Sequence, residues 1–290
     1  MFSVRFSSNC RAASTFIGVP EGVYYERIFH LFPSLRICHL FFWPYIHSIL
    51  DSQLVLPPDN TFMPVQISEN KFVQFCYNPD YLQSKTQLKT ISNVDSICDL
   101  INLAPTKSKI IVDGGNIIRS SNAVIMCDKV FHENKSVNEK DLIRQLKDSL
   151  EIENLFFVPW DKSDAIGHAD GMVRFLDNDT VLINNYSKEK PEFQRAFRMA
   201  LHNAGFDWTE IPYNPYDNKP SSSAEGIYLN YLQMQQAVII PTFNRKEDDE
   251  AVRIFEQIFK GQTIATVESN EIAKHGGVLN CITWNIKKHE

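Results

Sequence analysis

The chain has 290 residues, enough for one large domain or two ordinary ones. Hydrophobic residues make up 43% and charged residues 22%, as in a globular protein with a sizeable core. The formal net charge of −6 gives no electrostatic reason to expect nucleic acid as a partner, and it mildly favours a cationic small substrate. The cysteines lack CxxC spacing, which favours a reducing compartment over a disulfide framework or a zinc site: Cys10, Cys38, Cys76, Cys98, Cys127 and Cys281.

Residues 1–20 form a variable N-terminal segment, with arginines and serines and no acidic residue. This is the composition of a transit peptide or of a ragged terminus. We favour the second interpretation and a cytoplasmic protein. The apolar stretch 28–50 is interrupted by Pro33, Pro44, Arg36 and three histidines. We therefore expect a buried helix near residues 42–50 and no membrane span.

Three segments combine a helical apolar pattern with a strand-like run that follows it. Residues 137–152, with Asn138 as a helix cap, lead into "NLFFVPW"; residues 190–205 lead into "FDWTEIPY"; residues 248–261 lead into "QTIATVE". The expected apolar faces consist of Leu142, Leu146 and Leu150, then Phe193, Phe197, Leu201 and Ala204, then Val252, Phe255 and Phe259. Further strands are expected in "KIIVDGG", "GMVRFLD", "DTVLINN" and "AVIIPTF". The pattern predicts an α/β protein of similar modules, with one domain over 21–290.

Four short stretches carry residues suited to chemistry, each at the end of a strand-like run. They are "IIVDGGN" (110–116), "PWDKSDAIGHADGMVRF" (159–175), "YLNYLQMQQAVIIPTF" (228–243) and "HGGVLNC" (275–281). A rigid strand delivers side chains into the loop that follows it, so active residues tend to occupy such places.

In the second stretch, His168 and Asp170 are two residues apart. On an extended segment such residues point to the same side, so both could address one ligand. Gly167 and Gly171 flank them and would allow close backbone approach. The alternative is a turn with a surface histidine and a solvated aspartate.

Cys281 is either a buried, inert residue or a nucleophile, which needs a histidine within reach. His168 is the best partner, since His275 reads as a loop residue. A protease would need an oxyanion site that nearby carboxylates oppose. A guanidinium is instead a planar cation that carboxylates bind in bidentate geometry. Asp113 and Asp170 could hold it while Cys281 attacks its central carbon.

The motifs "DGGN", "GHADGMVRF", "AVIIPTF" and "GGVLNCITWN", in this order, resemble the agmatine deiminase and Porphyromonas-type peptidylarginine deiminase family. The resemblance runs from about Met63 to the C-terminus. It implies the pentein fold, an α/β propeller of five ββαβ-like modules around a pseudo-fivefold axis. It also implies a hydrolase that needs no metal and no cofactor, such as one that converts agmatine to N-carbamoylputrescine and ammonia on the route to putrescine.

By this resemblance, Cys281 is the nucleophile that forms an amidino-thioether. His168 would protonate the leaving ammonia and then activate the hydrolytic water, and its charge changes near neutral pH. Asp113, where many members have glutamate, and Asp170 would grip the guanidinium.

Four further residues complete the candidate site. Gly276 and Gly277 would let the backbone run close to the substrate. Asn116 and Trp160 would line the pocket or support it, with a structural role equally open for each.

The chain departs from the family pattern in two places. Asn280 precedes the cysteine where agmatine deiminases usually have histidine. The family's Trp-x-Arg-Asp stretch, whose aspartate is another guanidinium ligand, is absent from "LPPDNTFMPVQ" (56–66), as if residues were missing between Thr61 and Phe62. Asp59 lies beside two prolines and is not given the role. A buried cation site that lacks one carboxylate predicts feeble or absent activity.

Four functional readings follow from the sequence. The first is a deiminase of agmatine or another small guanidine, and the second is a deiminase of arginine within peptides. The third is a degenerate pentein that binds a guanidine or a partner without turnover, and the fourth is a structural α/β protein with coincidental motifs. We expect no nucleic acid or membrane partner; a homodimer is compatible with the sequence, and the substrate's length stays open.

Overall fold

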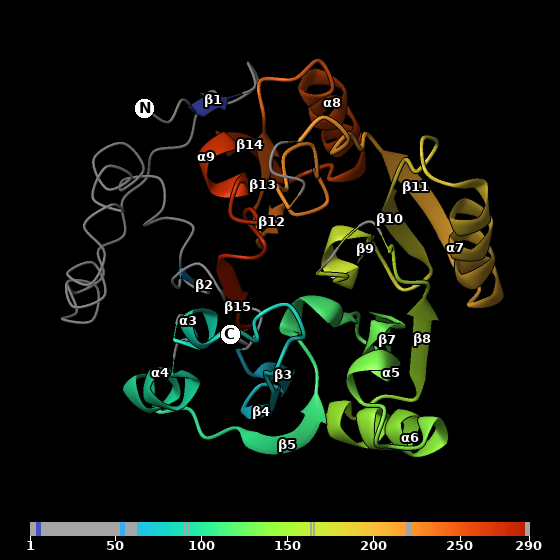
Figure 1. The fold of residues 1–290 in the computed structure, drawn as a ribbon. Helices are drawn as coiled ribbons and strands as arrows, with labels where there is room; N and C mark the ends of the chain where they lie inside the picture. The colour runs from blue at the N-terminus through green and yellow to red at the C-terminus, as the bar shows by residue number, and fades with distance from the viewer. Residues whose placement is uncertain are drawn as a thin grey trace.

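A computed structural model describes residues 4–6, 53–55, 63–89, 91, 93–162, 164, 166–218 and 222–287 (Figure 1). Within the N-terminal segment 1–20, the described part is the strand β1 (Val4–Phe6). Several sequence expectations lie outside the described residues. These are the transit-peptide composition, the helix near 42–50, Asp59, and the junction between Thr61 and Phe62.

Four ββαβ modules follow one another along the described chain. In each, two antiparallel strands precede a helical segment, and the last strand pairs in parallel with the middle one. The first two modules contain β3 (Val65–Ser68), β4 (Lys71–Cys76), α3 (Lys85–Leu88), α4 (Val94–Leu100) and β5 (Thr106–Ile111), then β6 (Ile118–Arg119), β7 (Ala123–Cys127), α5 (Lys129–Glu133), α6 (Glu139–Leu150) and β8 (Asn154–Val158).

The third and fourth modules have the same order. They contain β9 (Val173–Phe175), β10 (Thr180–Asn184), α7 (Pro191–Asn203) and β11 (Asp207–Ile211), then β12 (Leu232–Gln233), β13 (Ala237–Thr242), α8 (Asp248–Ile258) and β14 (Thr263–Glu268). Strand β1 adds to the edge of the fourth sheet beside β14. The order matches the predicted ββαβ repeat.

A fifth, two-stranded sheet pairs β15 (Thr283–Asn285) with β2 (Gln53–Val55), after the short helix α9 (Asn270–Ala273). In Figure 1 the modules follow one another around a ring, and β15 lies between the fourth module and the first. The predicted pentein arrangement is therefore confirmed, with the fifth module represented by these two strands within the described part of the chain.

The three longest helices, α6, α7 and α8, form where the apolar spacing predicts them. Asn138 caps α6 as expected, since its side chain accepts a hydrogen bond from the Lys140 N–H at 3.0 Å. The three predicted leucines of α6 are fully buried. In α8, Val252 is only partly buried, and Ala251 and Phe255 form the buried face instead. Phe193 and Ala204 are likewise at the margin of the α7 face, and Phe259 follows α8 as its C-cap.

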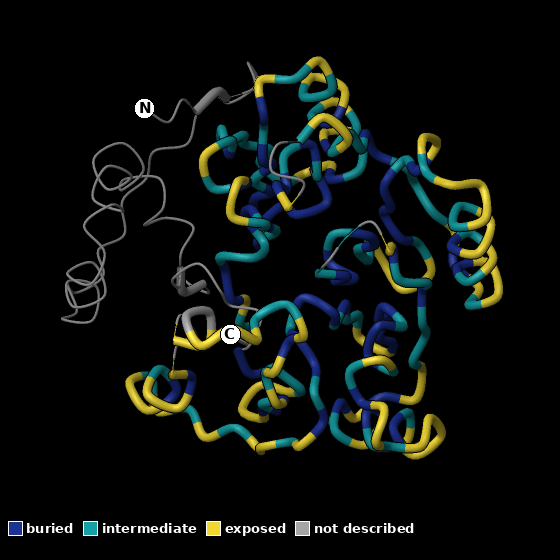
Figure 2. Tube along the Cα trace, in the orientation of Figure 1, coloured by how far each residue is buried: buried dark blue, intermediate teal, exposed yellow. Residues whose placement is uncertain are grey.

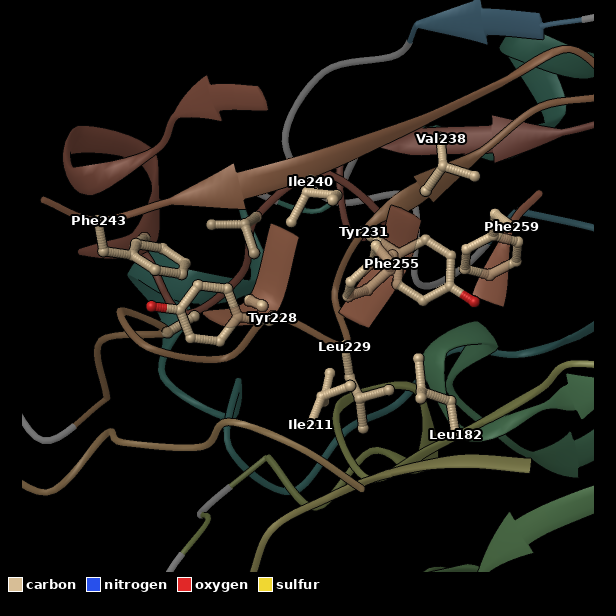
Figure 3. Packing of buried hydrophobic residues seen from close by; sticks show 14 residues of the cluster. Leu182, Ile211, Tyr228, Leu229, Tyr231, Val238, Ile240, Phe243, Phe255 and Phe259 are labelled. Carbon is tan, nitrogen blue, oxygen red and sulfur yellow. The ribbon is translucent and has the colours of Figure 1, made fainter. Parts of the chain in front are cut away.

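The core consists of hydrophobic clusters, each shared by two neighbouring modules. The strands are largely buried, and the exposed residues lie mainly on the outer helices (Figure 2). Figure 3 shows the cluster around the fourth module, where Tyr231 packs edge-on against Phe255 with ring centroids 4.9 Å apart. Among the described residues, no helix has the length and apolarity needed to cross a bilayer.

Candidate active site

Asp113, His168 and Asp170 stand at two short 3-10 helices. Asp113 caps η2 (Gly114–Asn116) directly after β5, and His168 caps η3 (Ala169–Gly171), which contains Asp170. The sequence analysis considered His168 and Asp170 on one extended segment. The structure instead places Asp170 in a 3-10 helix. Both are nonetheless only 6% and 3% exposed, which excludes a surface turn. A Cβ on Gly115 would lie 2.5 Å from His168 Nδ1 and 3.2 Å from Asp170 Oδ1, so both side chains border this glycine.

Asp113 pairs with the imidazole. Its Oδ2 lies 2.8 Å from His168 Nε2 and accepts a hydrogen bond from the Tyr81 hydroxyl at 3.1 Å. Its Oδ1 is buried and has no hydrogen-bond partner among the described residues. The resemblance placed Asp113 beside Asp170 as a guanidinium ligand, whereas this geometry makes it first the partner of His168. Tyr81 was not found from the sequence, because an isolated tyrosine in a loop carries no distinguishing pattern.

The charges around His168 favour its protonated form. Burial alone would lower the pKa of His168, but the hydrogen bond and charge of Asp113, with the charges of Asp170 and Asp164, offset burial and leave the pKa raised. The imidazolium of His168 therefore forms more readily than that of a free histidine.

Cys281 lies in a turn two residues before β15 and so does not open the strand itself. Its Sγ accepts a hydrogen bond from Asn230 Nδ2 at 3.2 Å and lies 3.9 Å from Asp170 Oδ2. The side chain is partly buried among these polar groups, which argues against inert core filling. Burial and then the charge of Asp170 raise the pKa of the thiol. Both effects favour the thiol over the thiolate in the free protein.

Two asparagines surround Asp170 and Cys281. Asn280 Nδ2 donates to Asp170 Oδ2 at 2.8 Å, so the residue that replaces the usual histidine holds the carboxylate. Asn230, buried ahead of β12, contacts both the carboxylate and the sulfur. The stretch 228–243 was singled out from the sequence, but nothing in its pattern distinguished Asn230 from its neighbours.

The glycines differ in their roles. A Cβ on Gly277 would lie 2.6 Å from Cys281 Cβ and 2.7 Å from its Sγ, so the backbone of Gly277 packs directly against the cysteine side chain. Gly276 adopts a φ of +92°, where other residues are strained. Gly167, also at positive φ, lies against the Trp160 ring. The close approach expected at Gly171 is not found, because a Cβ there would meet no atom within 4 Å.

Asn116 and Trp160 support the main chain around the site. The Asn116 amide donates to the Cys127 carbonyl at 3.2 Å and accepts from the Cys127 N–H at 2.6 Å, which ties η2 to β7. Trp160 Nε1 donates to the Asp164 carbonyl at 3.0 Å. Of the two roles left open for each, the contacts favour the structural one.

A buried lysine contacts the segment just before His168, which we call the histidine loop. Lys129 Nζ donates to the Ile166 carbonyl at 2.7 Å and pairs with Asp80 at 2.9 Å and Glu133 at 3.6 Å. Burial, followed by the charge of Asp113, raises the pKa of Glu133 to about 7. The sequence reading missed both residues because a Lys and Glu four apart on a short helix look like a surface pair. No cluster of three His, Cys, Asp or Glu suited to a metal ion occurs in the described part of the chain.

The model of the Porphyromonas-type peptidyl-arginine deiminase family matches residues 59–286. The chain belongs to this family. An agmatine deiminase of Pseudomonas aeruginosa (strain LESB58) is 22% identical over 208 residues, which are 60% of this chain and 56% of that protein. The chain spans only 56–60% of the length of three curated relatives that it matches.

Solved agmatine deiminases share the fold of this family member. The C. jejuni enzyme superimposes with a TM-score of 0.62 at 19% identity, over 76% of this chain and 69% of that one. The Enterococcus faecalis enzyme gives a TM-score of 0.64 at 15% identity, over 80% and 74% of the two chains. The pentein fold inferred from four short motifs is thus confirmed.

Proposed function

We propose that the protein is a hydrolase that deiminates a guanidinium group, with agmatine as the first candidate substrate. One observation carries the proposal: the Cys281 sulfur lies 3.9 Å from the buried Asp170 carboxylate, close to the histidine loop. The agmatine deiminases to which the chain is similar support the same chemistry.

The charge balance of the site favours a cation. The Asp170 carboxylate is buried beside the sulfur, and the second oxygen of Asp113 has no hydrogen-bond partner among the described residues. A guanidinium presents several N–H donors in one plane, so it can satisfy such carboxylate oxygens while its central carbon faces a sulfur. A neutral amide would gain no comparable attraction.

The proposed reaction begins when the Cys281 thiol releases its proton to solvent as the cation binds. A bound guanidinium next to Asp170 would offset the charge that raises the pKa of Cys281, so the thiolate forms when the cation is present. The sulfur then attacks the central guanidinium carbon and forms a C–S bond. The protonated His168, held by Asp113, gives its proton to one nitrogen as the C–N bond breaks and ammonia leaves.

The second half consumes one water. Neutral His168 takes one proton from water, whose oxygen attacks the amidino carbon. As the C–S bond breaks, the remaining water proton goes to the Cys281 sulfur, which leaves a carbonyl oxygen on the product and restores the thiol. The net change is the replacement of one amino group by oxygen, with release of ammonia. From agmatine the product would be N-carbamoylputrescine, which places the reaction on a route to putrescine. We expect it in the cytoplasm, where a free thiol persists.

A chloroacetamidine probe and an ammonia assay test the proposal together. The probe carries the amidinium cation and should alkylate Cys281 faster than uncharged chloroacetamide does, and agmatine should protect the thiol. Ammonia release should be abolished in Cys281→Ala and retained in Cys98→Ala, since Cys98 is buried in another part of the fold. Equal alkylation by both probes, together with no ammonia from any guanidine, would exclude a deiminase.

A second candidate substrate is arginine within a peptide, favoured by the description of the matching family. Agmatine, free arginine and an arginyl peptide assayed side by side separate the two candidates. A third outcome is a degenerate pentein, since the Trp-x-Arg-Asp stretch is missing. In that case the amidine probe would react with Cys281 without turnover of any of the three substrates.

A further inference from the structure

Lys129 carries a positive charge into the interior of the fold. Its side chain is 1% exposed, at the first position of α5. Asp128 fixes the backbone there, because its N–H donates to the Val158 carbonyl at 2.9 Å and its Oδ1 accepts from the main-chain N–H of Trp160 at 2.8 Å. A buried ammonium is costly unless its N–H groups are bonded, so the partners of Lys129 indicate its role.

The ammonium joins two segments that are far apart in the sequence. Nζ donates to the Ile166 carbonyl in the histidine loop at 2.7 Å, and it pairs with Asp80, in the loop after β4, at 2.9 Å. Glu133, on the same helix as Lys129, lies 3.6 Å from Nζ. Since Asp80 belongs to the first module, Lys129 links that module to the loop that carries His168.

Asp113 links the same two segments a little further along each. Its Oδ2 lies 2.8 Å from His168 Nε2 and accepts from the Tyr81 hydroxyl at 3.1 Å. His168 follows Ile166 by two positions, and Tyr81 follows Asp80 directly. The two links are therefore parallel. A shift of the histidine loop relative to the Tyr81 segment would break the contact between His168 and Asp113.

The stem of Lys129 also contacts the histidine loop. Gly167 adopts a φ of +66°, and a Cβ there would lie 3.0 Å from Lys129 Cδ, so the loop backbone packs directly on the stem. Nζ lies 5.0 Å from the centroid of the Tyr81 ring and 5.3 Å from that of the Trp160 ring, within the range of cation–π attraction. The side chain thus packs against the histidine loop and against Tyr81.

We propose that Lys129 is a positioning residue for His168, which ties the histidine loop to Asp80 and so keeps the imidazole on Asp113. The role rests on the proposed deiminase chemistry, in which His168 transfers the protons. A lysine that only stabilised the fold could be lost without any change in the pKa of His168. Loss of a nearby positive charge by itself would favour the imidazolium, whereas loss of the contact with Asp113 disfavours it. The two effects therefore have opposite signs.

The test is the pKa of His168 in Lys129→Met, measured by NMR titration of the full chain labelled with ¹⁵N at histidine. Methionine keeps an unbranched stem and lacks the ammonium. The His168 resonance is assigned by its absence in His168→Gln. No substrate is present, so the result is independent of whether the protein turns over any guanidine.

We expect the pKa of His168 to fall by about one pH unit in Lys129→Met. Lys129→Arg keeps donors for both partners and should restore most of the loss. An unchanged or raised pKa in folded Lys129→Met overturns the proposal.

Lys162→Met is the matched control. Lys162 is also a cation beside this loop, but it is exposed, and its Nζ lies 3.4 Å from the centroid of the Trp160 ring instead of at the Ile166 carbonyl. Its loss should leave the pKa of His168 at the wild-type value or slightly above it. A fall equal to that in Lys129→Met overturns the proposal.

Asp80→Asn decides the matter if Lys129→Met does not fold. The Asp80 side chain is 43% exposed, so its replacement leaves the core intact while it weakens the tie to the first module. The pKa of His168 should again fall. In 1 M salt the direct effect of a half-exposed charge is screened within about 3 Å, whereas a displaced loop stays displaced. The fall should therefore persist in 1 M salt. No fall, or one that disappears with salt, overturns the proposal.

Discussion

His168 Nε2 lies 2.8 Å from Asp113 Oδ2, although the two residues are 55 positions apart. Each follows a different strand of the ring, β5 for Asp113 and β8 for His168. The pairing orients the ring and favours its cationic form.

Replacing Asp113 by asparagine should lower the pKa of His168, because the hydrogen bond and charge that raise it are weakened. Loss of a correctly held acid and base should reduce ammonia release by about 10²–10⁴-fold. NMR titration of the imidazole in wild type and Asp113→Asn measures the pKa directly. An unchanged pKa in the variant would contradict the assignment.

The same pair predicts a pH dependence of stability. The pKa of His168 is raised in the folded state. The stabilisation that the protonated ring gives to the fold is therefore fully present below the pKa of about 6.5 in the unfolded chain, and it is lost as pH rises through the pKa in the folded state. The difference in unfolding free energy between wild type and Asp113→Asn should therefore shrink from pH 5.5 toward alkaline pH. Denaturant titrations at several pH values measure it, and a difference that widens with pH would have the wrong sign.

Gly115 should tolerate no side chain. A Cβ there would come within 2.5 Å of His168 Nδ1, so Gly115→Ala must push the imidazole away from its place. We expect at least about a tenfold loss of activity, since small misplacements at a reacting centre are costly. Gly171→Ala is the control, because a Cβ at Gly171 meets no atom within 4 Å. Comparable losses in both variants would show that the spacing at Gly115 is not decisive.

Glu133 should destabilise the fold at alkaline pH. Its pKa is raised from 4.5 to about 7, so the folded state binds the proton more tightly than the unfolded chain, and stability falls as pH rises through this interval. Glu133→Gln should therefore unfold less readily than wild type at pH 8, by at most about 3 kcal/mol. At pH 4 the gain should vanish. Thermal or denaturant unfolding at the two pH values gives both differences.

Restoring the family's Trp-x-Arg-Asp segment after Thr61 should raise activity. A third carboxylate around a buried cation is worth a few kcal/mol, or about a hundredfold in binding. Ammonia release from agmatine by the extended chain measures the gain. The same insertion with asparagine in place of the aspartate controls for length and should lack most of it. Equal turnover with and without the segment would refute the role of the missing residues.

Much of the fold could be predicted because its signals are local. Leu142, Leu146 and Leu150 repeat at helical spacing and are all buried, and the Asn138 cap is where the sequence predicts it. The shorter helices α3 and α4 were missed, because 4 and 7 residues give too few turns to reveal a period. The fivefold arrangement itself came from the family motifs and not from periodicity.

The sequence marks residues that the structure brings together in the candidate site, but it does not show how they pair. Local motifs marked Asp113, His168, Asp170 and Cys281, yet which carboxylate meets the imidazole depends on how distant strands are placed around the ring. The contacts of Asn230 with the cysteine turn span 48 to 51 positions, so no local pattern announces them. Side chains that act by supporting others are recognised only once the partners are seen.

The ring order has a consequence for dividing the molecule. Asp113 follows the first module, His168 the second, and Cys281 the fourth. Any cut between residues 114 and 280 therefore separates the sulfur from at least one of the groups that would serve it. Two halves produced separately would each be inactive. Recovery of turnover on mixing them would show that they had reassembled into the complete ring of modules.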